Sequence, residues 1–317
     1  PTRRSSDLAA FEAAIELVDF TDNGPVALAA GSTRALQQEE AVYKALVLGV
    51  KDFVSKNGFS GVIVGLSGGV DSALTLAIAV DALGADNVQA VMMPSRYTAA
   101  MSREDAEAEA RAFGIRYDII SIEDAFEAFL DSLGQVFKGT EPDTTEENIQ
   151  ARCRGLILMA MSNKTGRMLL TTGNKSEMAV GYATLYGDMC GGFAPIKDVY
   201  KTLVYRLCHY RNSLGQVIPE RVLTRAPSAE LREDQVDQDS LPAYEVLDRI
   251  LELSVELDRP IDEVVKAGFE RETVEHVLGM VQRNEYKRRQ SAPGVRITRR
   301  AFGRDRRYPI TSGYRRK

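Results

Sequence analysis

The sequence of 317 residues has few cysteines, no long apolar run and only a small excess of charge. Its three cysteines, Cys153, Cys190 and Cys208, form no C-x-x-C pair, so neither a zinc site nor a disulfide framework is indicated. No apolar run reaches the length of a transmembrane span, and no secretory signal is visible. The net charge of −5 gives no reason to expect nucleic acid as a partner. We therefore expect a cytoplasmic protein with neither a membrane nor a nucleic-acid partner.

Two common nucleotide-binding motifs are missing as well. The pattern G-x-x-x-x-G-K-[ST] occurs nowhere, and no G-x-G-x-x-G follows an expected strand. Their absence argues against γ-phosphate hydrolases and against dinucleotide-dependent redox enzymes. Histidine is scarce too, since only His209 and His276 occur. Acid–base catalysis by histidine therefore has little basis in this chain.

What is present is an ordinary globular composition, with 44% apolar and 27% charged residues, on a chain long enough for one large domain or two small ones. The first residue is proline, and residues 1–7 form a polar stretch without periodicity. From Glu39 onward the hydrophobic pattern becomes regular. We expect residues 39–317 to form the domain and residues 1–38 to be a truncated tail.

Short apolar runs alternate with segments of helical spacing between residues 39 and 172. The run Gly61–Leu66 has the β-branched residues of a buried strand, and an alanine-rich stretch follows it as far as Gly84. Ser102 with Asp105 resembles a capping box and predicts a helix start there. We expect strands at 61–66, 88–93, 117–120 and 168–172, and helices at 39–56, 72–83, 102–113, 125–133 and 146–161. Such alternation predicts an α/β fold with a doubly wound parallel sheet.

The segment between the first of these strands and its helix suits a phosphate group. Backbone N–H groups at a helix N-terminus point toward a common centre, where the helix dipole favours an anion. Adjacent glycines let the backbone approach that anion, and two serines add hydroxyl donors. Asp71 alone would repel phosphate, but a bridging cation removes this conflict, so we expect Asp71 to bind Mg²⁺ together with phosphate oxygens. The predicted nucleotide-binding loop consists of Gly65, Leu66, Ser67, Gly68, Gly69, Val70, Asp71 and Ser72.

The same residues also satisfy Gly-x-Ser-x-Gly, the turn that exposes a nucleophilic serine in hydrolases. Ser67 would be the nucleophile, and His276 follows it in a suitable order. However, that turn normally lies deep in the strand order, whereas Ser67 follows the first expected strand of the domain. A glycine-rich turn that binds nothing is the third interpretation. The residue types favour the phosphate site.

A second polar segment, Thr172–Glu177, follows the last of the expected strands. In doubly wound sheets the ligand lies beyond the carboxyl ends of the strands. We therefore expect this segment and the loop at 65–72 to meet in one crevice. The alternative is a capped helix start without a ligand, which leaves Lys175 and Glu177 without a use.

The serine, paired glycines and aspartate after the first strand resemble the pyrophosphate loop of the ATP pyrophosphatase superfamily. Longer matches narrow the resemblance to the NAD synthetases, and it extends from about residue 39 to the C-terminus. The likeness is greater to the synthetase domain of the glutamine-dependent enzymes. The segments that carry it are 148–152, 171–182, 185–188, 227–231, 285–288 and 301–307.

This resemblance implies a Rossmann-like ATP pyrophosphatase fold with helical C-terminal additions. It also implies ATP- and Mg²⁺-dependent amidation of nicotinic acid adenine dinucleotide (deamido-NAD) to NAD. The substrate carboxylate would attack the α-phosphate of ATP to form an adenylate, from which ammonia would displace AMP. In the glutamine-dependent enzymes a nitrilase-like glutaminase domain precedes the synthetase. Residues 1–38 would be a remnant of the connection to it, and glutamine would serve only if that domain were supplied.

The resemblance also assigns roles at the matching positions. Asp71 and Glu177 would be catalytic residues that bind Mg²⁺. Besides residues 65–72, the ATP contacts would be Arg96, Thr172, Lys201 and Ser228. The contacts to deamido-NAD would be Asn148, Arg152, Glu177, Tyr182, Asp188 and Lys287. The sequence leaves open whether Lys201 lies on a solvated helix face and Arg96 on a loop surface.

The chain departs from the ammonia-dependent relatives in one stretch. Leu185 and Tyr186 stand in the region where those relatives have a lysine, and glycines at 191 and 192 stand where they have an aspartate. The roles of that lysine and that aspartate are therefore not carried over. Cys190, in the same stretch, has no histidine near it in sequence and is expected to be a packed thiol.

The C-terminal residues 287–317 hold twelve lysines and arginines against one acidic residue, Asp305. Such a run is typical of a solvated or interdomain surface, and a nearby polyanionic substrate is the sharper alternative. Members of the resembled family are homo-oligomers, and helix 39–56 or helix 146–161 would pack across a two-fold axis. The remaining alternatives are another pyrophosphate-loop ligase, a tRNA-modifying enzyme and a non-catalytic nucleotide-binding subunit.

Overall fold

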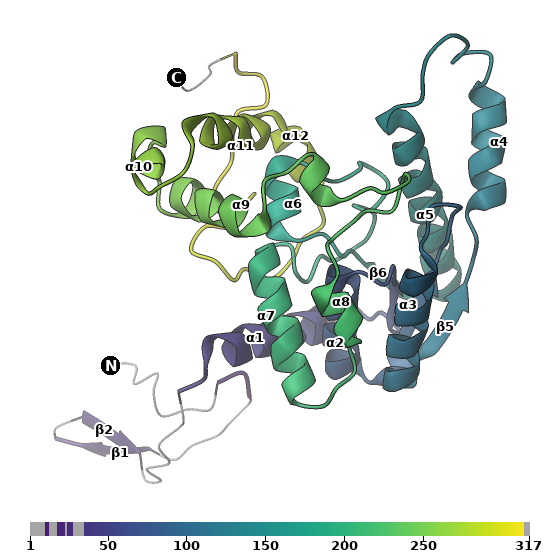
Figure 1. The fold of residues 1–317 in the computed structure, drawn as a ribbon. Helices are drawn as coiled ribbons and strands as arrows, with labels where there is room; N and C mark the ends of the chain where they lie inside the picture. The colour runs from purple at the N-terminus through teal and green to yellow at the C-terminus, as the bar shows by residue number, and fades with distance from the viewer. Residues whose placement is uncertain (1–9, 13–17, 23, 28–34, 314–317) are drawn as a thin grey trace.

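The computed structural model describes residues 10–12, 18–22, 24–27 and 35–313 (Figure 1). Two antiparallel strands, β1 (Val18–Thr21) and β2 (Gly24–Ala27), precede the first helix, α1 (Gln38–Lys56). The remaining residues of the expected N-terminal tail lie outside the described part of the chain.

A four-stranded parallel sheet organises the domain. Its strands are β3 (Val62–Gly65), β4 (Val88–Met92), β5 (Arg116–Ile119) and β6 (Met168–Leu170), in the spatial order β5-β4-β3-β6. The chain order reverses between β3 and β6, which are hydrogen-bonded neighbours. At such a reversal the carboxyl ends of the two strands leave a crevice for a ligand. The predicted parallel α/β sheet is confirmed.

Helices cover both faces of this sheet (Figure 1). One face packs against α1, α2 (Val70–Leu83), α3 (Ala100–Phe113) and α7 (Lys201–Ser213), and the other against α4 (Glu123–Leu133) and α5 (Thr144–Thr165). Alternate side chains of β3 point to opposite faces, so Val62 and Val64 join the first core and Ile63 joins the second. A short 3₁₀ turn, η1 (Ala85–Asn87), links α2 to β4.

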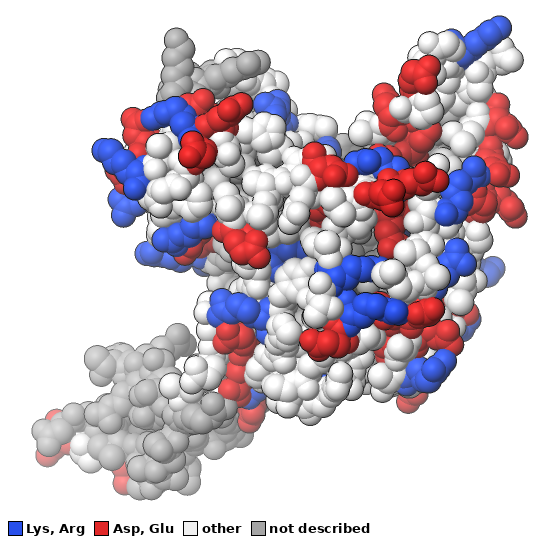
Figure 2. Space-filling view, viewed as in Figure 1, with Lys and Arg blue, Asp and Glu red and all other residues white. Residues whose placement is uncertain are grey.

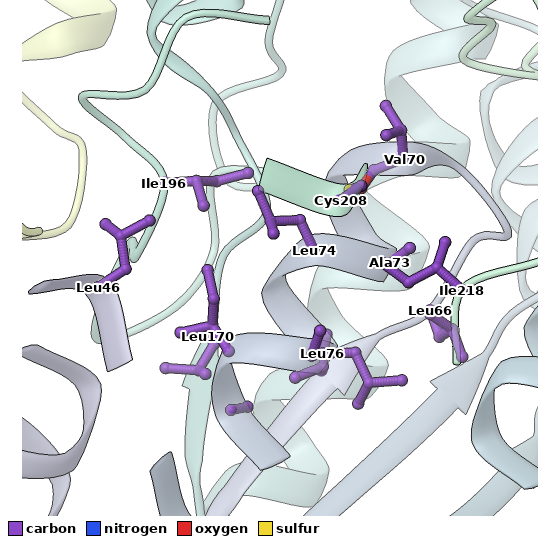
Figure 3. Close-up of a cluster of buried hydrophobic side chains, with 14 of the residues drawn as sticks. Leu46, Leu66, Val70, Ala73, Leu74, Leu76, Leu170, Ile196, Cys208 and Ile218 are labelled. Carbon is purple, nitrogen blue, oxygen red and sulfur yellow. The ribbon is translucent and has the colours of Figure 1, made fainter. Parts of the chain in front are cut away.

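The larger core lies between the sheet and α1, α2 and α7 (Figure 3). Leu46, Leu74 and Leu76 of the helices are fully buried there, together with Leu170 of β6 and Ile196. Each such side chain contributes about 1.5–3 kcal/mol on burial. Because α2 is apolar along almost its whole length, the loop that precedes it rests on a rigid support.

The chain after residue 190 adds a helical layer beside the sheet (Figure 1). Its core includes Leu247, Ile250, Val264 and Val277, and Val180 of α6 packs into the same cluster. Besides α7, the elements beyond β6 are α6 (Lys175–Val180), α8 (Glu220–Thr224), η2 (Asp237–Asp239), α9 (Tyr244–Leu251), the π-helical turn η3 (Glu252–Glu256), α10 (Ile261–Lys266), α11 (Arg271–Arg283) and α12 (Glu285–Arg288). Of the helices that the structure describes, none combines the length and apolar character needed to cross a bilayer.

Two element boundaries differ from the prediction in ways that matter for the site. Ala99, not Ser102, is the N-cap of α3, and Ser102 is buried within the helix, where its hydroxyl donates to Glu230. The predicted capping box at Ser102 is therefore wrong, because a tertiary contact takes the serine. Strand β6 ends at Leu170, two residues early, which leaves Thr172 free to line the crevice.

Basic and acidic side chains are interspersed on the face drawn in Figure 2. Much of the basic C-terminal run is likewise paired with acidic residues of the chain. Arg296 lies 2.7 Å from Asp305, and Arg300 and Arg306 both contact Asp258. These pairs favour an intramolecular surface over a polyanion-binding one for this part of the run.

Candidate functional site

Two adjoining cavities, of about 180 and 250 Å³, open at the carboxyl ends of β3 and β6. They share a wall to which both strand-end loops and the loop after α8 contribute. The shared residues are Ser67, Gly69, Thr171, Thr172, Asp188, Arg225, Ser228 and Ala229. The two polar segments singled out in the sequence therefore meet in one crevice.

The loop between β3 and α2 has the backbone of a phosphate cradle. Gly68 has a φ of +80°, and a Cβ there would lie 2.3 Å from the carbonyl oxygen of Ser102, so only glycine fits. Ser72 donates to the carbonyl of Gly69 at 2.9 Å and accepts from the backbone N–H of Ser67 at 3.2 Å, which closes the loop. Gly69 is the N-cap of α2, so the unpaired N–H groups of the first helical turn lie beside the smaller cavity.

Two carboxylates and one lysine meet on the wall of the smaller cavity. The ammonium of Lys201 lies 3.0 Å from Oε1 of Glu177 and contacts Oδ2 of Asp71. Asn174, the N-cap of α6, donates to Oδ1 of Asp71 at 2.8 Å and accepts from the backbone N–H of Glu177 at 3.0 Å. Lys201 is the first residue of α7 and only 2% exposed, so it does not lie on a solvated helix face. The three charged groups come from three separate segments.

The net charge of this cluster depends on whether Glu177 is ionised. Burial raises the pKa of Glu177 to about 8, against the opposing effect of Lys201. Burial also disfavours the charge of Lys201, but Asp71 and Glu177 together hold its pKa well above the ordinary value. Lys201 therefore stays charged and neutralises Asp71, while Glu177 is largely protonated near neutral pH. A cation that binds Glu177 would favour its ionised form.

Residues 181–188 form a loop that carries two of the predicted dinucleotide contacts to the cavities. Tyr182 lines the smaller cavity, and Asp188 lines both. Asp188 accepts from the backbone N–H of Thr184 at 2.8 Å, and burial raises its pKa to about 6. Burial raises the pKa of Tyr182 as well, and the nearby Asp237 adds to this effect.

A sequence model for NAD synthase matches residues 42–291. The chain belongs to the NAD synthase family. The glutamine-dependent NAD(+) synthetase of Xanthomonas campestris pv. campestris is 55% identical over 310 residues, which are 97% of this chain and 54% of that protein. The chain thus spans about half the length of the curated relatives it matches.

Solved structures of NAD synthetases share the fold. The glutamine-dependent enzyme from Acinetobacter baumannii, in complex with adenosine diphosphate, is 52% identical with a TM-score of 0.62, and the match covers 90% of this chain and 52% of that one. The NH3-dependent enzyme from Campylobacter jejuni subsp. jejuni, in complex with the nitrate ion, is 26% identical with a TM-score of 0.64. That match covers 80% of this chain and 96% of the other. The ATP pyrophosphatase fold expected from the sequence is confirmed.

Three positions expected from the resemblance to contact the dinucleotide bind the loop 181–188 in this structure, and their contact with the dinucleotide stays a prediction. Asn148 accepts from the hydroxyl of Thr184 at 2.7 Å, and Arg152 donates to a backbone carbonyl of the loop at 3.3 Å. Lys287 donates to two further carbonyls of it, at 2.8 and 2.7 Å. Asn148, Arg152 and Lys287 do not line either cavity, so this structure places them behind the loop that does.

Arg96 lines neither cavity in this structure, and its expected contact with ATP stays a prediction. Its guanidinium contacts Glu123 and lies 2.7 Å from Glu127, where the side chain is 43% exposed. The sequence pattern indicated a strand-end position for Arg96 but carried no sign of these two acidic partners, which lie on α4.

Two arginines that sequence reasoning missed do line the cavities. Arg225 lines both and donates to the carbonyl of Gly68 at 3.3 Å. Arg154 lines the larger cavity, where burial lowers its pKa to about 10. Each stands beside a segment that matches the NAD synthetases, two residues after Arg152 and two before Pro227. That proximity is the signal that could have found them.

Ser67 lacks the neighbours of a hydrolase nucleophile. Its hydroxyl oxygen lies 3.1 Å from that of Ser72. His209 on α7 and His276 on α11 are both exposed, and neither lines a cavity. The arrangement that the Gly-x-Ser-x-Gly pattern requires is therefore absent from the described residues.

Lys175, unlike its neighbour Glu177, lies outside the crevice. Its side chain is fully buried, and its ammonium lies 3.0 Å from both Asp198 and Glu256. The segment 172–177 is thus both a capped helix start and a wall of the cavity, and only part of it faces a ligand.

Proposed function

We propose that this chain catalyses the ATP- and Mg²⁺-dependent amidation of deamido-NAD to NAD, with ammonia as the nitrogen donor. The observation that carries the proposal is that the 65–72 loop, which contains Asp71, lines the same cavity as the side chains of Glu177 and Lys201. Membership of the NAD synthase family gives the reaction class. We further propose that residues 39–317 form the synthetase domain.

Asp71 and Glu177 fit a magnesium site that needs phosphate to be complete. Both contact the same nitrogen of Lys201, so one cation can reach both carboxylates. Among the described residues, no group of three or more histidine, cysteine, aspartate or glutamate side chains could hold a metal. Mg²⁺ commonly binds through one or two carboxylates together with substrate phosphates. When bound, it would neutralise negative charge on the phosphates of ATP.

The two cavities suit the two parts of an adenylation reaction. Apolar side chains of Leu66, Val91, Met93 and Leu158 line the larger one, which suits an adenine ring. The shared wall, with Thr172 and Ser228, would then hold the phosphates. Deamido-NAD would enter the smaller cavity beside Tyr182 and Asp188, with Asn148, Arg152 and Lys287 positioning that loop.

In this arrangement the substrate carboxylate oxygen attacks the α-phosphorus of ATP, and the bond to the β-phosphate oxygen breaks to release pyrophosphate. Ammonia then attacks the acyl carbon, AMP leaves with the bonding electron pair, and a proton is lost from nitrogen. The 65–72 loop and Lys201 bind the phosphates and neutralise their charge. Catalysis therefore rests on positioning and electrostatics rather than on a histidine.

Glutamine would serve as nitrogen donor only together with a glutaminase domain, since the family model that this chain matches is that of NAD synthase. We also propose a cytoplasmic location and a homo-oligomer. The exposed Leu156 of α5 and Tyr186 of the adjoining loop, 64% and 67% exposed, favour α5 over α1 as the contact between copies.

The test is an assay of the purified chain with ATP, Mg²⁺ and deamido-NAD, in which NAD and AMP are measured together. Ammonium should give both products in equal amounts, and glutamine alone should give neither. NAD formation from glutamine would show that a separate glutaminase is not needed. Ester hydrolysis that is lost in Ser67→Ala, without NAD formation, would favour the hydrolase instead.

A further inference from the structure

The ammonium of Lys201 lies between Asp71 and Glu177, the two carboxylates that would hold a metal ion. The ammonium contacts Oδ2 of Asp71 and lies 3.0 Å from Oε1 of Glu177. The other oxygen of Asp71 accepts from the amide of Asn174 at 2.8 Å. On the remaining side, the ring centre of Tyr244 lies 5.1 Å from the ammonium.

An ammonium and a divalent cation cannot share this point. Mg²⁺ binds oxygen at about 2.0–2.1 Å, so an ion held by the same two carboxylate oxygens would compete with Nζ for the space between them. Their repulsion would also be poorly screened, because Lys201 is almost fully buried. Metal binding to both carboxylates therefore requires the lysine to leave them.

We propose that Lys201 is an exchangeable counterion: it pairs with Asp71 and Glu177 before metal binds, and it transfers to the polyphosphate when the metal takes its place. This inference rests on the proposed function. Before metal and nucleotide bind, Lys201 offsets part of the negative charge of the two buried carboxylates. After the exchange, the displaced ammonium has a new anionic partner.

The anchoring of Lys201 permits such a movement. Its backbone N–H, at the start of α7, donates to the hydroxyl of Ser176 at 2.9 Å and fixes the base of the side chain. The flexible four-carbon side chain allows the ammonium to take another position within the cavity. The same cavity is lined by Ser67 and Gly69 of the phosphate loop, so a bound polyphosphate lies within that cavity.

The exchange couples metal binding to phosphate binding. A metal that enters alone would leave the buried ammonium of Lys201 without an ion pair, since Asp237, which lines the same cavity, forms none with it. Such a state is strongly unfavourable. A metal that enters with a polyphosphate supplies a counterion. The free chain should therefore take up divalent cations weakly, and loss of the lysine charge should relieve this penalty.

The experiment measures Mn²⁺ binding by electron paramagnetic resonance, without nucleotide, to the full chain. Lys201→Met and Lys201→Gln should bind Mn²⁺ at least about tenfold more tightly than the wild type, whereas Lys201→Arg, which keeps the charge, should bind as weakly. Adding Asp71→Asn to Lys201→Met should remove the gain. Lys197→Met is the matched control: Lys197 lines the same cavity, but its ammonium donates to the carbonyl of Ala292 at 2.6 Å.

Equal Mn²⁺ affinities in the wild type and in both neutral variants would overturn the exchange. An equal gain in Lys197→Met would overturn it too, since the effect would then reflect general charge. Melting curves show which of the two neutral variants is folded, and the Mn²⁺ affinity of a folded variant is then compared with that of the wild type. ATP binding to the wild type with Mg²⁺ is measured alongside: its absence would overturn the proposed function, while the Mn²⁺ comparison would still decide the exchange.

Discussion

Two buried lysines lie between pairs of carboxylates, and they differ in what else surrounds them. Lys175 lies 3.0 Å from Asp198 and Glu256, and it also donates to the hydroxyl of Thr298 and, at 2.9 Å, to a backbone carbonyl. Lys201 contacts the two carboxylates of the candidate site and lines a cavity. Both lysines lie between two carboxylates, but Lys175 is enclosed by the protein, whereas Lys201 lines a cavity that a ligand can enter. Access to a cavity, more than the ion pair itself, distinguishes the functional lysine.

The closed site has a structural role that its partners make plain. Lys175 begins α6, Glu256 ends the π-helical turn η3, and Thr298 belongs to the segment after α12. Asp198 accepts from the backbone N–H groups of residues 297 and 298, at 2.8 Å each. Lys175 thus links the start of α6, the helix that carries Glu177, to η3 and to the segment after α12.

The strongest test of the comparison is Lys175→Met. It leaves two carboxylates buried without their cation, which is expected to lower the free energy of unfolding by about 3–5 kcal/mol. Urea unfolding measures the change. Lys201→Met is the matched control and should cost less, because the cavity lets water reach its two carboxylates. Equal losses would contradict the distinction between closed and open sites.

Asp71→Asn tests the open site through its chemistry. The variant keeps the shape of the side chain but removes a charge needed for metal binding, so NAD formation should fall about 100- to 1000-fold. The fold should remain intact, as an unchanged urea transition would show. Turnover near the wild-type rate, with the same dependence on Mg²⁺ concentration, would refute the metal role of Asp71.

Glu109 sharpens the comparison, because it is a buried carboxylate without a lysine. Both its oxygens are buried without a hydrogen-bond partner, and burial, with a smaller effect of Asp105, raises its pKa to about 8. The folded chain therefore holds a proton that the unfolded chain releases near 4.5, so stability falls as pH rises between these values. Glu109→Gln removes this loss.

The expected gain is a few kcal/mol above about pH 8, with no difference well below pH 4.5. Urea unfolding of both proteins across this range measures it. A constant difference between Glu109→Gln and the wild type at all pH values would contradict the raised pKa.

The smallest effect is expected for Arg96→Ala. Its ion pairs with Glu123 and Glu127 lie at the surface, so the free energy of unfolding should change by less than about 1 kcal/mol. ATP affinity, measured by calorimetry, should change less than about twofold, because Arg96 does not line either cavity. A tenfold loss of ATP affinity would instead support the contact between Arg96 and ATP that the family resemblance assigns.

The sequence predicted those features whose causes are local. The β3 strand, the glycines at 68 and 69 and the apolar α2 each have a signal within a few residues, and strand alternation then predicted the crevice. The surroundings of Lys201 have no such signal. Its partners Glu177 and Asp71 lie 24 and 130 positions away, so only the assembled fold shows that the lysine is buried.

The same limit explains one wrong prediction and one position whose surroundings no local signal showed. Ser102 has the local pattern of a cap, but its hydroxyl serves Glu230, which lies 128 positions away. Arg96 follows a strand as a ligand contact would, yet acidic residues 27 and 31 positions later hold it at the surface. In both cases a long-range polar contact outweighed the local pattern.

The contacts of Lys175 also bear on the order in which the molecule is completed during translation. Thr298 and Arg300, whose oxygens accept from its ammonium, leave the ribosome 123 and 125 residues after Lys175 does. Until they emerge, the charge at the base of α6 lacks two of its acceptors, although domains begin to fold as they are synthesised. The helix that carries Glu177 therefore lacks part of the support at its base until residues 298–300 have been made.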